Sequence, residues 1–315
     1  MNPARPFVRP RALRPGGRVA LLTLASPAQA ADVESAADEL RVLGFEPIVM
    51  PPAAGPSAPY VSGSGAARAA QLQAVLADDR IGAVIASRGG YGSAQLLPFL
   101  DLDAVRLSRT LLVGYSDVTA LLDVVTGHAG LVSIHGPMAE GRLARGAEAY
   151  QREAFLRTVC EPEPPGVVAT PAAAVLQPGD AQGVLRGGTL TQVAALLGTP
   201  WAFNAREPTI LFLDDVNERP YRIDRLLWQL RQAGVFTHVT GVVFNELPGC
   251  DEPGGSVCAH DAVRHALHGF AGPVVTGVPS GHTAGAMLTL PFGVRATLHA
   301  SGGVRLSIDE AAVQA

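Results

Sequence analysis

A short apolar run that ends at a Gly-x-Ser turn is the feature that most constrains the fold of this chain. Residues 110–113 form the run, which is typical of a strand buried on both faces of a parallel sheet. The sequence Gly-Tyr-Ser-Asp at 114–117 interrupts it, and apolar residues then recur at helical spacing. A strand that turns sharply into a helix in this way lifts the serine hydroxyl above the sheet edge and points the first free helix amides toward it. Ser116 is therefore a candidate nucleophile, although serine at this place can also act only as a helix cap.

Strand and helix signals alternate through the whole first half of the chain. The predicted strands are 19–24, 47–50, 81–86, 110–113 and 131–134, and the helices between them are 33–43, 66–76, 94–100 and one that begins near 118. This alternation predicts an α/β fold with an open parallel sheet flanked by helices. Ligands bind beyond the carboxyl ends of the strands in such sheets. Residues 88–92, Ser116 and His135 can therefore converge at one edge.

The length of 315 residues favours two domains. Residues 161–183 are rich in proline and lack apolar periodicity, which is typical of a linker. We therefore predict an N-terminal α/β domain at 1–160, a linker at 161–182 and a smaller C-terminal α/β domain at 183–315. The C-terminal strands are predicted at 209–213, 242–245 and 274–276, with closing antiparallel strands at 287–290, 294–299 and 304–308. Residues 51–65, rich in Pro, Gly and Ser, predict a surface loop.

Composition and charge exclude several classes of function. The formal net charge is −4 and no long basic run occurs, which argues against a nucleic-acid partner. The three cysteines form no CxxC pair, which favours a reducing compartment. No stretch approaches the roughly 18 apolar residues of a membrane span, so we expect no membrane partner.

The N-terminal region is open to two interpretations. Residues 11–18 are basic, residues 19–25 are apolar, and the Ala-Gln-Ala sequence at 28–30 resembles a signal-peptidase site. The same apolar run also suits a buried first strand that follows a Pro-Gly-Gly turn.

Glycines at 89, 90 and 92 follow the predicted strand 81–86 and could bring backbone amides close to an anion. The segment lacks the GxGxxG spacing of dinucleotide-binding folds and the Gly-Lys-Ser/Thr of a P-loop. His260, His265 and His268 do not make a metal site, because only the last two share a helix face and no Cys or acidic partner completes a set. We therefore predict no cofactor and no metal.

The same glycine amides would suit the oxyanion of an acyl-transfer reaction. The N–H groups of Gly90 and Asp117 would then stabilise a tetrahedral intermediate, and each such donor is typically worth about 10²–10³ in rate.

A serine nucleophile needs a base, and the base needs a carboxylate that orients it. His282 lies on a glycine-bearing loop just after a predicted strand, and Asp214 and Glu218 lie just past the strand 209–213. The order serine, acid, histidine is that of the α/β-hydrolases, but the turn at 114–117 lacks the final glycine of their G-x-S-x-G motif. The spacing alone leaves open that His282 is an ordinary loop histidine and that the acids belong to a solvated turn.

Six ordered motifs between about residues 17 and 293 together resemble the LD-carboxypeptidase family. They are Ser-Arg-Gly-Gly-Tyr-Gly at 87–92, Gly-Tyr-Ser-Asp at 114–117, His-Gly-Pro-Met at 135–138, Leu-Arg-Gly-Gly at 185–188, Phe-Leu-Asp-Asp-Val-Asn-Glu-Arg-Pro-Tyr-Arg at 212–222, and Gly-His at 281–282 followed by Leu-Thr-Leu-Pro-Phe-Gly at 288–293. The resemblance implies a Ser–His–Glu serine peptidase with an N-terminal domain akin to class I glutamine amidotransferases, a smaller C-terminal domain and often a homodimer. It also favours a strand at 19–24 over a signal peptide.

The family's catalytic residues fall on Ser116, Glu218 and His282. Asp214 is the second choice for the acid, since family members usually carry Glu at that position. Release of one terminal residue also requires recognition of its carboxylate, which suits the bidentate fork of arginine. Arg88 and Arg186 adjoin the glycine motifs and are candidates, although either could instead form an ion pair between the domains.

The resemblance implies release of the terminal D-alanine from murein tetrapeptide, a cytoplasmic step of peptidoglycan recycling. Two alternatives stay open. The first is hydrolysis of a peptidyl-nucleotide antibiotic, as in the microcin C immunity branch, although residues 161–180 lack the aromatic residue expected to stack a nucleobase. The second is a non-catalytic protein of similar fold that binds a small ligand.

Overall fold

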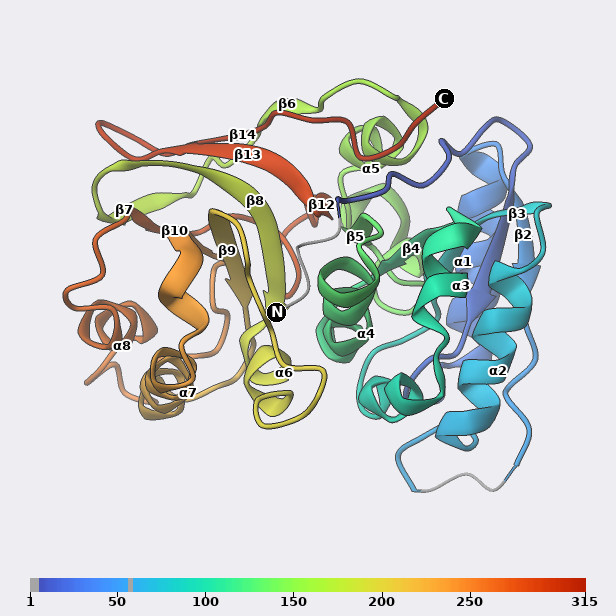
Figure 1. Ribbon diagram of the computed structural model, residues 1–315, viewed down its shortest axis with the longest axis horizontal. Coiled ribbons are helices and arrows are strands. Elements are labelled where there is room, and N and C mark those ends of the chain that lie inside the picture. Colours follow the sequence, from blue (N-terminus) through green and yellow to red (C-terminus); the bar gives the residue numbers. More distant parts are fainter. Residues whose placement is uncertain (1–5, 56–58) are drawn as a thin grey trace.

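The computed structural model describes residues 6–55 and 59–315, and two sheets form its framework. Figure 1 shows them side by side, with the N-terminal sheet on the right and the C-terminal sheet on the left. The predicted mixed α/β fold with parallel and antiparallel strands is confirmed. Residues 56–58 of the predicted loop 51–65 lie outside the described residues.

The N-terminal sheet has six strands in the order β12-β5-β4-β3-β1-β2. Its first five strands in sequence run parallel, and β12 pairs antiparallel with β5. They are β1 (Arg18–Leu22), β2 (Glu46–Val49), β3 (Ile81–Ala86), β4 (Leu111–Gly114), β5 (Ser133–His135) and β12 (Leu290–Phe292). Strands β3 and β4 are almost wholly buried, as expected for apolar runs with packing on both faces.

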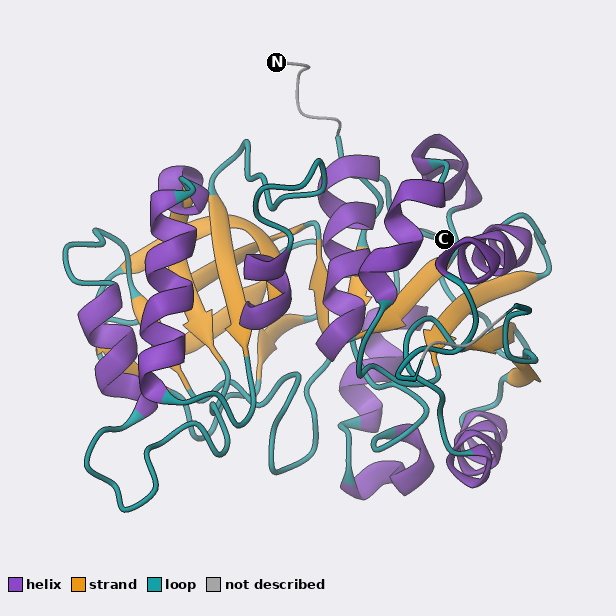
Figure 2. Cartoon of the chain, turned by 90° about the horizontal axis from the view of Figure 1, so that it is seen from below, coloured by secondary structure: helices purple, strands orange, loops and turns teal. Residues whose placement is uncertain are grey.

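Helices connect these strands and pack around them (Figure 2). The α-helices are α1 (Ala30–Val42), α2 (Gly65–Leu76), α3 (Leu102–Ser108), α4 (Thr119–Val124) and α5 (Arg152–Cys160). The shorter turns are η1 (Ser93–Phe99), η2 (Ser116–Val118), η3 (Val125–Ala129) and η4 (Leu143–Glu148). The predicted helix 94–100 is the 3₁₀ helix η1, which contains Pro98; proline lacks the N–H that an α-helix interior requires.

The C-terminal sheet has eight strands in the order β6-β14-β13-β8-β9-β10-β11-β7. Its four central strands, β8 to β11, run parallel, and antiparallel strands extend both sides. They are β6 (Gly166–Val168), β7 (Ala174–Gln177), β8 (Asp180–Thr189), β9 (Thr209–Asp214), β10 (Val239–Phe244), β11 (Val274–Thr276), β13 (Val294–His299) and β14 (Arg305–Ile308). The helices of this half are α6 (Leu190–Ala195), α7 (Pro220–Gln232), η5 (Val235–His238) and α8 (Ala259–Ala266).

The segment predicted as a linker differs from the expectation. Residues 161–182 contain β6 and β7, which form the two edges of the C-terminal sheet, and the start of β8. Edge strands tolerate prolines beside them because one side of each strand needs no ladder hydrogen bonds, so the proline content did not reveal them.

The two halves share one hydrophobic core. Buried residues of the first sheet pack in a single cluster with Leu185, Phe212 and Val243 of the second. Strand β12 adds to this continuity, because it lies in sequence between β11 and β13 of the C-terminal sheet yet pairs with β5. The predicted strand at 287–290 begins three residues later than expected, at Leu290.

The order of the parallel strands brings several functional loops together. The strand order reverses between β1 and β3, because the chain continues from β1 to β2 on one side and from β3 to β4 on the other. Ligands of open parallel sheets bind at the carboxyl edge beside such a switch point. In the second sheet, the loops after the parallel strands gather beyond their arrowheads (Figure 2). Within the described part of the chain, no helix is both long and apolar enough to cross a membrane.

Candidate active site

The turn after β4 holds Ser116 in a strained backbone conformation. Its φ angle is 61°, in the left-handed region that residues with a side chain rarely adopt. Such strain costs on the order of 1–3 kcal/mol and is typical of functional turns. Gly114 makes the turn possible, because a Cβ atom there would lie 2.8 Å from Cγ1 of Val118. The predicted turn from strand to helix is therefore present, with the hydroxyl at the sheet edge.

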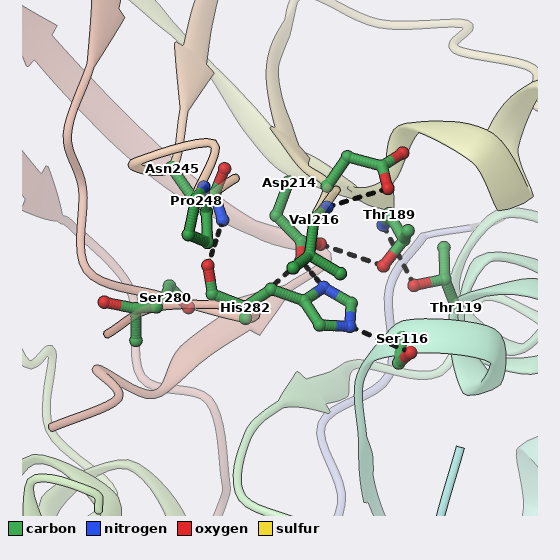
Figure 3. Close-up of polar contacts among 12 residues, drawn as sticks. Ser116, Thr119, Thr189, Asp214, Val216, Asn245, Pro248, Ser280 and His282 are labelled. Carbon is green, nitrogen blue, oxygen red and sulfur yellow. Dashed lines mark hydrogen bonds and ion pairs between the residues drawn. The ribbon is translucent and has the colours of Figure 1, made fainter. Parts of the chain in front are cut away.

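His282 comes to this serine from the other half of the molecule. It lies in the loop between β11 and β12, and its Nε2 atom is 3.0 Å from Oγ of Ser116, as Figure 3 shows. The ring of Tyr115 packs edge-on against the imidazole, with 5.2 Å between ring centroids. Residues 166 positions apart in sequence thus form one hydrogen-bonded pair.

The carboxylate behind His282 is that of Asp214, at the end of β9. Its Oδ2 atom lies 2.6 Å from Nδ1 of His282 and also accepts the backbone N–H of His282 at 3.0 Å. Its Oδ1 atom accepts the hydroxyl of Thr189 at 3.0 Å. The carboxylate is fully buried, so these hydrogen bonds replace its lost hydration.

Glu218, the first choice for this acid, does not occupy that place. Its carboxylate lies 3.6 Å from the guanidinium of Arg222, one helical turn along the chain. The reason is local: β9 ends at Asp214, and the chain then turns through Asn217, at a φ of 57°, toward the start of α7. Asp214, the second choice for the acid, therefore contacts the histidine because it lies at the end of the strand.

The buried site shifts the pKa values of its members in opposite directions. Burial disfavours the imidazolium of His282, but the hydrogen bond and charge of Asp214 outweigh it and raise the pKa above its ordinary value. Burial likewise opposes ionisation of Asp214, yet the hydrogen bond and charge of His282 hold its pKa low. The neighbouring Asp215 accepts hydrogen bonds from Thr191 and from the N–H of Val216, but burial outweighs them and raises its pKa to about 6.

The glycine-rich loop after β3 packs directly on the nucleophile turn. A Cβ atom at Gly89 would lie 2.9 Å from Cβ of Ser116 and 3.4 Å from the amide nitrogen of Asp117, so only glycine fits. The carboxylate of Asp117 accepts the amides of Gly92 at 3.2 Å and Ser93 at 2.8 Å. Gly90 and Asp117 therefore lie on the two adjoining segments, as an oxyanion site would require.

A buried arginine, Arg68, donates hydrogen bonds to this loop and holds it in place. Arg68 donates to the carbonyl oxygens of Leu24 and Gly92 and to the side chain of Gln95. No sequence pattern points to Arg68, because an arginine inside a predicted helix ordinarily faces solvent.

The two arginine candidates lie in different surroundings. Arg88 keeps a partly exposed guanidinium next to the glycine loop, 3.3 Å from Glu140, and donates to the carbonyl of Pro27. Arg186 is only 2% exposed, pairs with Asp123 at 3.0 Å and stacks over Phe203. It joins β8 to α4 through this ion pair, the alternative that the sequence left open for Arg186, and its contact with substrate stays a prediction.

His135, at the end of β5, lies beside the site. Both of its ring nitrogens are buried and have no hydrogen-bond partner among the described residues, and Nε2 is 4.0 Å from Oδ1 of Asp214. Burial lowers its pKa to about 4, so the ring is neutral near pH 7. In the described residues, no group of three or more His, Cys, Asp or Glu side chains could hold a metal.

A serine, a histidine and an aspartate hydrogen-bonded in this order, at the carboxyl ends of buried strands, form the arrangement that serine hydrolases use. The sequence also assigns the chain to one family of such proteins. Residues 19–136 match the LD-carboxypeptidase N-terminal domain and residues 182–298 match the LD-carboxypeptidase C-terminal domain, so the chain belongs to the LD-carboxypeptidase family.

Relatives of known name agree with this assignment. The chain is 38% identical to a putative carboxypeptidase of Streptomyces coelicolor, over 98% of both chains. It is 32% identical to a murein tetrapeptide carboxypeptidase of Pseudomonas aeruginosa, over 71% of this chain and 75% of that one.

Solved structures share the fold. A muramoyltetrapeptide carboxypeptidase from Oxalobacter formigenes superposes with a TM-score of 0.81 at 29% identity, over 93% of this chain and 99% of that one. The microcin C7 self-immunity protein, in complex with aspartyl sulfamoyl adenosine, superposes with a TM-score of 0.86 over 98% of this chain and 100% of that one. Its 23% identity shows the shared fold alone.

Proposed function

We propose that this protein is a serine carboxypeptidase that releases the terminal D-alanine from murein tetrapeptide through an acyl-enzyme. The observation that supports it is the chain of hydrogen bonds from Ser116 through His282 to Asp214, which spans both halves of the molecule. The named murein carboxypeptidases among the relatives support the substrate.

In the proposed reaction, His282 takes the proton from Ser116 as Oγ attacks the carbonyl carbon of the L-configured residue before the D-alanine. Asp214 holds the ring with Nδ1–H toward its Oδ2 atom and stabilises the imidazolium. Backbone amides of Gly90 and Asp117 bind the oxyanion. The amide bond then breaks, and His282 delivers the proton to the leaving amine.

Deacylation repeats these steps with water. His282 accepts a proton from the water as its oxygen attacks the ester carbonyl, and returns it to Oγ of Ser116 when the ester bond breaks. The products are the tripeptide acid and free D-alanine. None of these steps calls for a cofactor.

Recognition of the free terminal carboxylate is the remaining requirement for a carboxypeptidase. Arg88 is the candidate, because it adjoins Gly89 and Gly90 and its side chain stays partly exposed despite its contact with Glu140. A substrate carboxylate would compete with Glu140 for the guanidinium. Cytoplasmic location and a homodimeric state are further parts of this proposal.

The test is incubation of the purified protein with murein tetrapeptide and detection of tripeptide and D-alanine. The Ser116→Ala variant is expected to lose on the order of 10³-fold or more in kcat/KM. Parallel incubation with an aminoacyl sulfamoyl adenosine separates the two branches of the family. Cleavage of that compound and not of the tetrapeptide would refute the murein assignment.

A further inference from the structure

A buried arginine from the other half of the molecule donates hydrogen bonds to the loop that carries His282. Arg142 lies between β5 and η4 and is 7% exposed. Its Nη2 atom donates to the carbonyls of Gly281 at 3.1 Å and Thr283 at 2.8 Å, and its Nη1 atom donates to Gly285 at 3.1 Å. A second Nη1 contact reaches the carbonyl of Ala149 at 3.0 Å. One guanidinium therefore holds three alternate carbonyls of the histidine loop.

The opposite side of the loop is held by the C-terminal domain itself. Glu246 accepts the hydroxyl of Thr283 and the backbone N–H of Ala284. Asn245 donates its side-chain amide to the carbonyl of His282 at 2.5 Å. Glu246 and Asn245, together with Asp214 of β9, thus fix the loop to its own half of the molecule, whereas Arg142 fixes it to the domain that carries Ser116.

Arg142 is unusual in the way its charge is accommodated. In the part of the chain that the structure describes, no carboxylate lies within ion-pair distance of it, and four neutral backbone carbonyls accept its N–H groups. Burying a cation without a counterion costs free energy, so the contacts need another explanation than stability alone. The guanidinium also lies 6.0 Å from the ring centroid of Tyr115, which packs on His282.

We propose that Arg142 is a positioning residue that holds the His282 imidazole in place against Ser116 across the domain boundary. The proposal rests on the three loop carbonyls, because the guanidinium presents its N–H donors in a rigid planar fork that suits acceptors at fixed positions. The proposal deepens the proposed function and rests on it for its kinetic test.

The charge of Arg142 acts on His282 against the neighbouring carboxylates. Asp214, at the end of β9, and Asp215 beside it favour the imidazolium and raise the pKa of His282, whereas burial and Arg142 lower that pKa. The other groups that face the site are the ring of Tyr115 after β4 and the neutral His135 at the end of β5. Loss of the arginine charge should therefore raise the pKa of His282.

Two variants separate position from charge. Arg142→Lys keeps the charge but loses the planar fork, and Arg142→Gln loses both. Arg145→Gln is the matched control, because Arg145 is exposed in the same segment. Each protein is compared with the parent in kcat and KM on murein tetrapeptide, and the pKa of His282 is read by NMR of the ¹³C-labelled imidazole without substrate.

We expect Arg142→Gln and Arg142→Lys to lower kcat by about 10- to 100-fold with little change in KM, since misplacement of a catalytic group by about 1 Å can cost 10²-fold. Arg142→Gln should also raise the pKa of His282, and Arg142→Lys and Arg145→Gln should not. Parent kcat in Arg142→Lys together with an unchanged His282 pKa in Arg142→Gln would overturn the inference. An inactive parent would instead refute the proposed substrate, and the NMR titration would still test Arg142.

Discussion

Asp214 binds His282 twice, through the ring at Nδ1 and through the backbone N–H, with the same carboxylate oxygen. The first contact fixes the ring orientation, and the second fixes the loop on which the ring is carried. The hydroxyl of Thr189 holds the other carboxylate oxygen. An aspartate at the end of a rigid buried strand therefore sets both the position and the tautomer of the proposed base.

Substitution at the two acids should have very different effects. Asp214→Asn should lower kcat on the order of 10⁴-fold, because the amide cannot hold the ring in the required tautomer. Glu218→Gln is the matched control and should leave kcat within about threefold, since its carboxylate pairs with the exposed Arg222 and not with His282. Steady-state kinetics on murein tetrapeptide decides between them. A larger loss in the Glu218 variant would restore the original choice of acid.

The pH dependence of kcat/KM should report the ionisation of His282. The base is active when neutral, so kcat/KM should rise with pH through a midpoint above 6.5, the direction in which Asp214 shifts the pKa of His282. The stability that His282 gains from Asp214 is complete below about pH 6.5, the unfolded pKa, and is lost as pH rises through the folded pKa. A pH profile of kcat/KM on the parent enzyme checks the midpoint. A midpoint below 6.5 would contradict the assigned contact.

The carboxylate of Asp117 should matter apart from the backbone amide of the same residue. Asp117→Asn replaces one of two acceptor oxygens by a donor and leaves the N–H of Gly92 or Ser93 unpaired, which costs about 1–3 kcal/mol of unfolding free energy. The displaced glycine loop should also lower kcat by about tenfold or more. Urea unfolding and kinetics measure both effects. Glu34→Gln, on the exposed face of α1, is the control, and equal behaviour of the two variants would exclude this role.

The ion pair between Arg186 and Asp123 should behave as a buried structural contact. Replacement of Arg186 by Met should lower the free energy of unfolding by about 3–5 kcal/mol, because it leaves a buried carboxylate unpaired. Arg186→Met combined with Asp123→Leu should recover much of that loss, since Nε of Arg186 and Oδ2 of Asp123 have no hydrogen-bond partner among the residues that the structure describes. Urea denaturation of both variants tests this expectation. A double variant less stable than the single one would show that the charges are needed.

The sequence was most informative where local physics decides the outcome. Three features depend only on residues close to them in sequence, and all three appear as expected. They are the apolar run before Ser116, the glycine that permits the turn and the buried strand 209–213. The edge strands β6 and β7 were missed because prolines beside an unpaired edge look like a linker.

What the residues alone determined is a parallel α/β framework with a serine turn and a histidine loop at its strand ends, because those features depend on periodicity and on glycine at a few tight positions. Only the tertiary structure decided which carboxylate meets His282, that Arg186 is buried in an ion pair, and that Arg142 ties the histidine loop to the other domain. These contacts join residues distant in sequence, and their choice depends on where each strand ends and how the two sheets pack together, which no local pattern records.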